Sequence, residues 1–142
     1  MKYDDASWHY GGNFPKDLPE SAGATHIGMF VAWALLNGLA GNRHEAENAA
    51  DLVKLRERRE TPGAWFIRCC DEKFIDQDLS RQGNAFARAY YGNEKTPYLR
   101  YIDDYSEVFA TATTLYHVPD TWQSYDRLAL VISSRYQTFT GG

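Results

Sequence analysis

The segment that most constrains the fold is the uninterrupted apolar run from Ile27 to Leu36. Helical apolar spacing extends from about Thr25 to Leu39, and large side chains such as Trp33 make the remaining faces apolar as well. A helix that is apolar on most sides belongs in the centre of a core, because every face must be shielded from water. The run is too short to span a bilayer, which takes about 20 apolar residues. The sequence therefore predicts a central core helix.

Capping residues and helical apolar spacing predict further helices along the chain. Thr61-Pro62 and Thr96-Pro97 each place a capping Thr before a Pro at the first helical position. Asp120 is predicted to cap the last helix, with Gln123 placed for a capping box. The predicted helices run from His44 to Glu60, from Thr61 to about Asp71, from Ser80 to Tyr91, from Thr96 to about Phe109 and from Asp120 to about Tyr136.

The remaining segments complete a one-domain prediction. Glycines and prolines punctuate residues 1–24, which predicts an irregular segment that wraps the domain, with a short strand possible near Lys2–Tyr3. Residues 71–79 form an acidic connector, and residues 140–142 are expected to fray. A length of 142 residues suits one domain. We therefore expect a mainly α, single-domain bundle of about five or six helices over residues 1–142.

The charge balance excludes two classes of partner. Asp and Glu outnumber Lys and Arg by 19 to 15, which gives a net charge of -4. A nucleic-acid surface needs an excess of basic residues, and a polybasic membrane patch needs a cluster of them, so neither partner is expected. A mildly acidic chain suits a basic protein partner instead. Aromatic residues make up 15% of the chain, which fits either a thick aromatic core or exposed binding anchors.

The cysteines and the N-terminal segment indicate a cytoplasmic location. Cys69 and Cys70 are adjacent, a spacing that rarely allows a disulfide, so reduced thiols are expected. Residues 1–10 carry charges and have no apolar core region, so they do not form a signal peptide.

No catalytic motif stands out. The four histidines His9, His26, His44 and His117 are widely spaced and lack the zinc-protease pattern, and the chain has no G-x-S-x-G elbow and no phosphate-binding loop. No cofactor or metal is predicted, although a metal site assembled across the fold stays open. Clustered carboxylates are the plausible catalytic groups, and they also suit solvated surfaces or an acidic rim that covers a basic site on a partner.

Five stretches together carry a family resemblance. They are Met1–His9 (MKYDDASWH), Gly23–Phe30 (GATHIGMF), Asp71–Phe74 (DEKF), Gly83–Ala87 (GNAFA) and Tyr125–Leu128 (YDRL). In this order they resemble a family of short bacterial proteins of unknown function, similar to immunity proteins that neutralise toxins delivered by secretion systems. The resemblance implies a bacterial protein-binding module and brings no catalytic residues with it.

The leading hypothesis is a cytoplasmic immunity-type protein, not an enzyme, that binds a toxin domain with a basic face. The predicted partner-binding residues are Asp71, Glu72, Phe74, Asp76, Asp78, Tyr101, Asp103, Asp104, Tyr105 and Glu107. One alternative is a small enzyme that uses Asp4, His9 and His26 around a pocket under the N-terminal segment, where Trp8 also lies. Another is a homo-oligomeric structural or regulatory domain whose surplus aromatics are buried at a symmetric interface.

Overall fold

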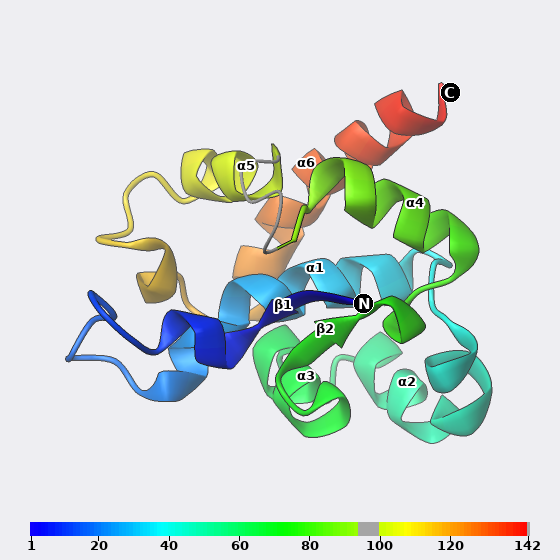
Figure 1. Cartoon of the computed structure of the whole chain (residues 1–142), viewed down its shortest axis with the longest axis horizontal. Coiled ribbons are helices and arrows are strands. Elements are labelled where there is room, and N and C mark those ends of the chain that lie inside the picture. The colour runs from blue at the N-terminus through cyan, green and yellow to red at the C-terminus, as the bar shows by residue number, and fades with distance from the viewer. Residues whose placement is uncertain (94–99, 142) are drawn as a thin grey trace.

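A computed structural model, which describes residues 1–93 and 100–141, places helix α1 (Thr25–Leu36) in the middle of the fold (Figure 1). Helices α2 and α3 lie on one side of α1 in this view, and α4, α5 and α6 lie on the other. The mainly α single domain that the sequence predicts is confirmed. The other α-helices are α2 (Ala49–Arg56), α3 (Pro62–Cys70), α4 (Arg81–Tyr90), α5 (Arg100–Val108) and α6 (Trp122–Thr140), and the strands are β1 (Lys2–Asp5) and β2 (Lys73–Ile75).

Helix α1 is the predicted core helix and is buried along its whole length up to Leu35. It ends three residues before the predicted Leu39, because Gly38 adopts a left-handed conformation with φ of 79°. The Leu39 N–H then turns back and donates to the carbonyl of Ala34 at 3.0 Å. Gly28 allows α3 to approach closely, since a Cβ at this position would lie 2.8 Å from the Pro62 carbonyl.

The N-terminal segment contains a true strand, β1, which pairs antiparallel with β2. Lys2 lies opposite Ile75, and Asp5 lies opposite Lys73. The predicted acidic connector is therefore partly a strand, which corrects the assignment of residues 71–79 to a plain connector. Because β2 has only three residues between acidic neighbours, it is too short to show the alternation that marks a strand.

The predicted helix from His44 to Glu60 is divided in two. A π-helical turn over Arg43–Glu47 is followed by Asn48 with φ of -128°, and α2 begins only at Ala49. The side chain of His44 is buried and bonded to Asp78, so a tertiary contact, rather than helical periodicity, determines the conformation of this turn. The helix then ends at Arg56, before the predicted Glu60.

Two predicted helix starts are confirmed. Thr61 accepts a hydrogen bond from the Ala64 N–H at the start of α3, and Ser80 accepts one from the Gly83 N–H at the start of α4. The predicted start at Thr96-Pro97 lies outside the described residues. At the C-terminus, Thr140 is still helical and Gly141 closes α6 in a left-handed conformation, so fraying at these two positions is not seen.

The predicted capping role of Asp120 is wrong. The residue that caps α6 is its neighbour Thr121, whose hydroxyl accepts from the Ser124 N–H at 3.1 Å. The Asp120 carboxylate accepts instead from the Gly63 N–H at 2.7 Å, at the start of α3. Sequence order cannot reveal this, because the capping residue and its helix belong to distant parts of the chain.

Replacing Asp120 with Ala should lower the free energy of unfolding by about 1–2 kcal/mol, the range for loss of a helix cap. Its carboxylate accepts from two backbone N–H groups, of Gly63 and Ala64, and from the Thr61 hydroxyl. Urea unfolding would measure the loss. Asp126→Ala, at an exposed position on α6, serves as the control and should cost under about 1 kcal/mol. Equal losses in the two variants would contradict the capping role.

Candidate functional site

The candidate site is built around Asp4, the third residue of strand β1. Pairing of β1 with β2 directs this side chain into the domain, where Asp4 is 7% exposed. Its carboxylate accepts hydrogen bonds from the Tyr91 hydroxyl at 2.6 Å and the Asp5 N–H at 2.8 Å. The residue is thus a buried carboxylate held by fixed donors, which is an expensive arrangement for a group with no further role.

His9 is brought back onto Asp4 by a 3-10 turn, η1 (Ala6–His9). The turn begins after Asp5, whose side chain accepts from the Ser7 N–H at 2.9 Å. The Nε2 atom of His9 lies 3.0 Å from Asp4 Oδ1, and its Nδ1 atom lies 2.9 Å from the Tyr116 hydroxyl. Both ring nitrogens of His9 are therefore engaged, one with a carboxylate and one with a phenol.

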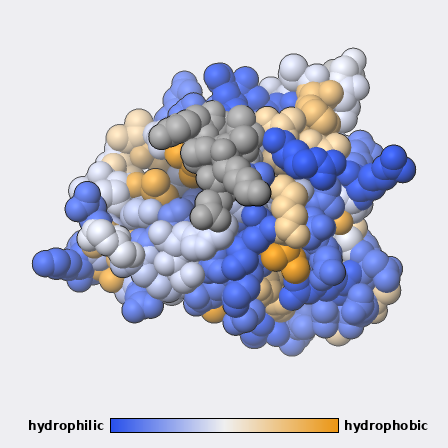
Figure 2. All heavy atoms as spheres, in the orientation of Figure 1, coloured by the Kyte–Doolittle hydropathy of each residue, from blue (hydrophilic) through white to orange (hydrophobic). Residues whose placement is uncertain are grey.

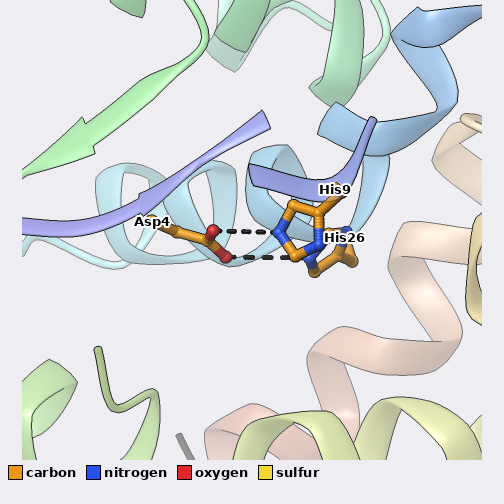
Figure 3. A group of neighbouring side chains, drawn as sticks. All are labelled: Asp4, His9 and His26. Atoms are coloured by element: carbon orange, nitrogen blue, oxygen red, sulfur yellow. Dashed lines mark hydrogen bonds and ion pairs between the residues drawn. The ribbon is translucent and has the colours of Figure 1, made fainter. Parts of the chain in front are cut away.

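His26 is the second residue of α1, and its ring lies beside that of His9 on the same side of Asp4 (Figure 3). Its Nε2 atom lies 3.7 Å from Asp4 Oδ2, beyond hydrogen-bond distance, and its ring meets that of His9 edge-on at a centroid separation of 4.6 Å. The side chain is 1% exposed. Neither ring nitrogen has a hydrogen-bond partner among the described residues, a rare condition for a buried polar group.

The charges of this cluster follow from its burial. Burial alone would raise the pKa of Asp4, but the nearby His26 ring and the hydrogen-bonded His9 ring outweigh it and hold that pKa well below its usual range. Burial lowers the pKa of His26, more than the neighbouring carboxylate raises it. At neutral pH the site therefore contains an ionised carboxylate beside a neutral imidazole.

A pocket of about 170 Å³ is lined in part by Asp4, His9 and His26. Its size suits a small molecule or part of one, because drug-sized ligands fill pockets of roughly 300–1,000 Å³. Trp8, which is 43% exposed, lies on its wall. The described lining residues include no Lys or Arg and are Tyr3, Asp4, Trp8, His9, His26, Tyr91, Gly92, Asn93 and Ile102.

Among the described residues, two groups of side chains have the composition of a metal site. Potential ligand atoms of Asp4, His9 and His26 all lie within 4.8 Å of one another. The same holds for His44, Cys70 and Asp78.

The second of these groups is better explained as a structural network. Asp78 is fully buried and already accepts from Arg43 at 3.1 Å, His44 at 2.8 Å and the Ile75 N–H at 2.9 Å. The Arg43 guanidinium already balances the negative charge of Asp78, the carboxylate that a metal cation would need as a ligand. Burial, followed by the charge of Asp78, raises the pKa of the Cys70 thiol well above its ordinary value, which favours the neutral form.

Half of the predicted partner-binding residues lie in the interior, which corrects their assignment to a contact surface. The buried members are Phe74, Asp78, Tyr101, Asp104 and Tyr105. Phe74 faces inward because it lies on strand β2 and packs against Tyr3 at a centroid distance of 4.7 Å. These aromatic side chains are part of the core and cannot serve as anchors unless the domain unfolds.

The other acidic residues are wholly or partly exposed, but they do not form one face. The turn at Asp71 and helix α5 lie on opposite sides of α1 in Figure 1. The face seen in Figure 2 is mostly hydrophilic, with its hydrophobic atoms in small separate groups. Toxin binding through these residues stays a prediction. The exposed and half-buried members are Asp71, Glu72, Asp76, Asp103 and Glu107.

Acidification should destabilise the protein partly through Asp104. Burial raises the pKa of Asp104, but hydrogen bonds from Arg135 and Tyr90 outweigh it, so the folded-state pKa lies below the usual value. This stabilisation is fully present above an unfolded pKa of about 3.9 and is lost as pH falls through the folded pKa.

Urea unfolding between about pH 6 and pH 3 would measure this contribution. We expect Asp104→Asn to lose less stability on acidification than the parent protein does. The exposed neighbour Asp103 gives the matched control, since Asp103→Asn should follow the parent curve. Parallel curves for Asp104→Asn and the parent would contradict the assignment.

Together, the structure defines a small helical domain with a buried carboxylate–histidine cluster under an open pocket. The chain belongs to a family that shares a domain of unknown function, DUF7832, whose model it matches over residues 2–118. The matched range includes the whole cluster and ends before α6 begins. The match does not extend to an immunity role, which stays a prediction.

No curated protein and no solved structure shows significant similarity to the chain. Among the described residues, no helix has the length and apolar character needed to cross a membrane.

Proposed function

We propose that the protein is a small hydrolase whose active site is the cluster of Asp4, His9 and His26. The observation that carries this proposal is His26. A neutral imidazole, almost fully buried, directs unpartnered nitrogens into a region that also contains an ionised carboxylate and opens to a pocket. Such nitrogens need a polar partner, and a bound water or substrate group beside them satisfies this need.

The chemistry of these groups suits activation of water. A carboxylate and imidazole side chains can orient a water molecule and accept its proton while it attacks an electrophilic carbon. The Tyr116 hydroxyl, 2.9 Å from His9, supplies a donor or acceptor at the edge of the cluster. Asp4 is held by Tyr91 and the Asp5 N–H, so the arrangement is fixed before a substrate enters.

The lining of the pocket favours an uncharged acyl substrate. Phosphate esters are commonly bound by Arg and Lys side chains, and the described wall contains neither residue. Asp4 would repel an anion placed beside it. Trp8, Tyr91 and Ile102 instead offer flat and apolar contacts to an ester or amide with a small hydrophobic group.

The test is hydrolysis of model substrates by the protein as purified. We expect turnover of p-nitrophenyl acetate and butyrate, and none of p-nitrophenyl phosphate. Asp4→Asn and His9→Gln should each reduce the rate by about 100-fold or more, as for loss of a group that acts in proton transfer.

His117→Gln is the matched control for this assay. His117 forms a similar but exposed pair with Asp17, at 3.1 Å, and does not line the pocket. The control should retain full activity, because His117 lies outside the pocket and the Asp4 cluster. Rates no higher than that background, or equal losses in the control and the site variants, would overturn the proposal.

A further inference from the structure

We propose that Asp4, His9 and His26 bind one divalent transition-metal ion of the Zn²⁺ class. The inference rests on the proposed hydrolase, because it names the cofactor of the same site. It departs from the expectation that the chain needs no cofactor, which was based on the absence of a local sequence motif. The three ligands come from strand β1, turn η1 and helix α1, so the fold, and not the spacing along the chain, brings them together.

The separations between the ligand atoms match those around a small metal ion. Ligands about 2.0–2.2 Å from a tetrahedral ion lie roughly 3.3–3.6 Å from one another. His9 Nε2 lies 3.0 Å from Asp4 Oδ1, and His26 Nε2 lies 3.7 Å from Asp4 Oδ2. The two distances run to different oxygens of the carboxylate, and candidate ligand atoms of all three residues lie within 4.8 Å of one another. Rotation of these side chains would bring the ligand atoms to the separations of a bound ion.

His26 supplies an independent reason for a ligand at this point. It is 1% exposed and neither nitrogen has a hydrogen-bond partner among the described residues. A hydrogen bond cannot explain why His26 lies near Asp4, because the 3.7 Å between His26 Nε2 and Asp4 Oδ2 exceeds hydrogen-bond length.

The groups behind the ligands resemble the outer shell of a metal site. A ligating histidine commonly donates its other ring N–H to an oxygen, and His9 Nδ1 lies 2.9 Å from the Tyr116 hydroxyl. A ligating carboxylate is itself hydrogen-bonded, and Asp4 accepts from Tyr91 and from the Asp5 N–H. These hydrogen bonds therefore hold the His9 ring and the Asp4 carboxylate in place beside His26.

Three protein ligands leave a coordination position for solvent or substrate. This ligand count is typical of catalytic zinc, whereas structural zinc has four protein ligands. When bound, an ion of this class polarises a carbonyl and lowers the pKa of a coordinated water. The pocket beside the cluster gives small molecules access to that position.

The experiment begins with protein freed of metal by dialysis against a chelator. Titration calorimetry with Zn²⁺ should give one site per chain, and Co²⁺ should give the visible absorption of a low-symmetry, four-coordinate ion. His9→Gln and His26→Gln should each weaken Zn²⁺ binding by about 100-fold or more, and Tyr116→Phe by about 10-fold. His117→Gln, which alters the exposed pair with Asp17, should bind as the parent does.

The outcomes separate this proposal from the hydrolase itself. No stoichiometric binding, or binding that His9→Gln and His26→Gln leave unchanged, overturns the metal site. Hydrolysis that survives complete removal of metal overturns the metal proposal and leaves the hydrolase. Binding with the expected variant pattern but without hydrolysis supports the metal site and overturns the hydrolase. If His26→Gln does not fold, His9→Gln decides the question, because its side chain is 22% exposed on a surface turn.

Discussion

His26→Phe should stabilise the metal-free protein while it abolishes hydrolysis. The ring of His26 is surrounded by the aromatic rings of His9, Tyr105 and Tyr116, and its nitrogens have no partner among the described residues. A buried polar atom without a hydrogen bond costs about 1–3 kcal/mol, and phenylalanine, a somewhat larger aromatic side chain without polar atoms, avoids that cost. We expect the free energy of unfolding to rise by about 1 kcal/mol.

Activity is expected to change in the opposite direction. Ester hydrolysis should fall by about 100-fold or more, because the variant lacks one of the groups that act on water. Urea unfolding in the presence of chelator and the p-nitrophenyl ester assay would measure the two effects in the same preparation. A more stable but inactive variant is the signature of a residue retained for function rather than for packing.

His44→Phe provides the contrasting control. His44 is also a buried histidine beside an aspartate, but its Nε2 lies 2.8 Å from Asp78, within hydrogen-bond distance. Its replacement removes one hydrogen-bond partner from the buried Asp78 carboxylate, a loss that typically costs about 1–3 kcal/mol. If His26→Phe is destabilised as strongly as His44→Phe, then His26 is a structural residue and the proposed site is wrong.

Phe30→Ala should lower the free energy of unfolding by about 3–5 kcal/mol, the range for removal of a large buried aromatic side chain. Phe30 lies at the middle of α1 and is 1% exposed. The surrounding structure cannot close around the vacated space, because aromatic rings from α1, β2, α4 and α5 already pack against one another there. The rings within reach of Phe30 are those of Trp33, Phe74, Phe86, Tyr90, Tyr91 and Tyr101.

Chemical denaturation would measure this loss, and circular dichroism at neutral pH would show whether the variant still folds. Leu130→Ala on α6 is the control, since Leu130 is 76% exposed and its truncation should change stability by less than about 0.5 kcal/mol. A loss below about 1 kcal/mol in Phe30→Ala would show that the core can collapse around this position.

The helices could be predicted from sequence where local chemistry determines them. Thr61 with Pro62, and Ser80, begin helices because a hydroxyl caps nearby N–H groups, and the spacing of such residues is visible in the chain. The turn at His44 and the cap at Asp120 could not be predicted in this way. Each depends on a partner from a distant segment, which overrides the local preference.

The residues of the site could be predicted from the sequence, but their arrangement could not. Asp4, His9 and His26 were singled out as one possible cluster, but nothing in the spacing shows that a turn at Asp5 and the pairing of β1 with β2 bring them together. Nothing in the sequence indicates that Tyr91 and Tyr116 belong to the site, since tyrosine is common in this chain and only the fold places these two residues beside the cluster.

The predicted partner surface was wrong in its aromatic residues for a related reason. Phe74, Tyr101 and Tyr105 stand near acidic residues in sequence, but neighbours along a strand or helix point to different sides. Sequence proximity to charge therefore did not indicate exposure.

The pairing of β1 with β2 also determines when the site can form during synthesis. Asp4 and His9 leave the ribosome well before β2, and Tyr116 follows later still. Until those segments emerge, the early side chains stay hydrated and cannot adopt their final geometry, because long-range contacts form only after the chain between them is available. A nascent chain arrested before Tyr116 would hold most of the helical core and an incomplete site. The earliest residues of the cluster are thus among the last to reach their final positions.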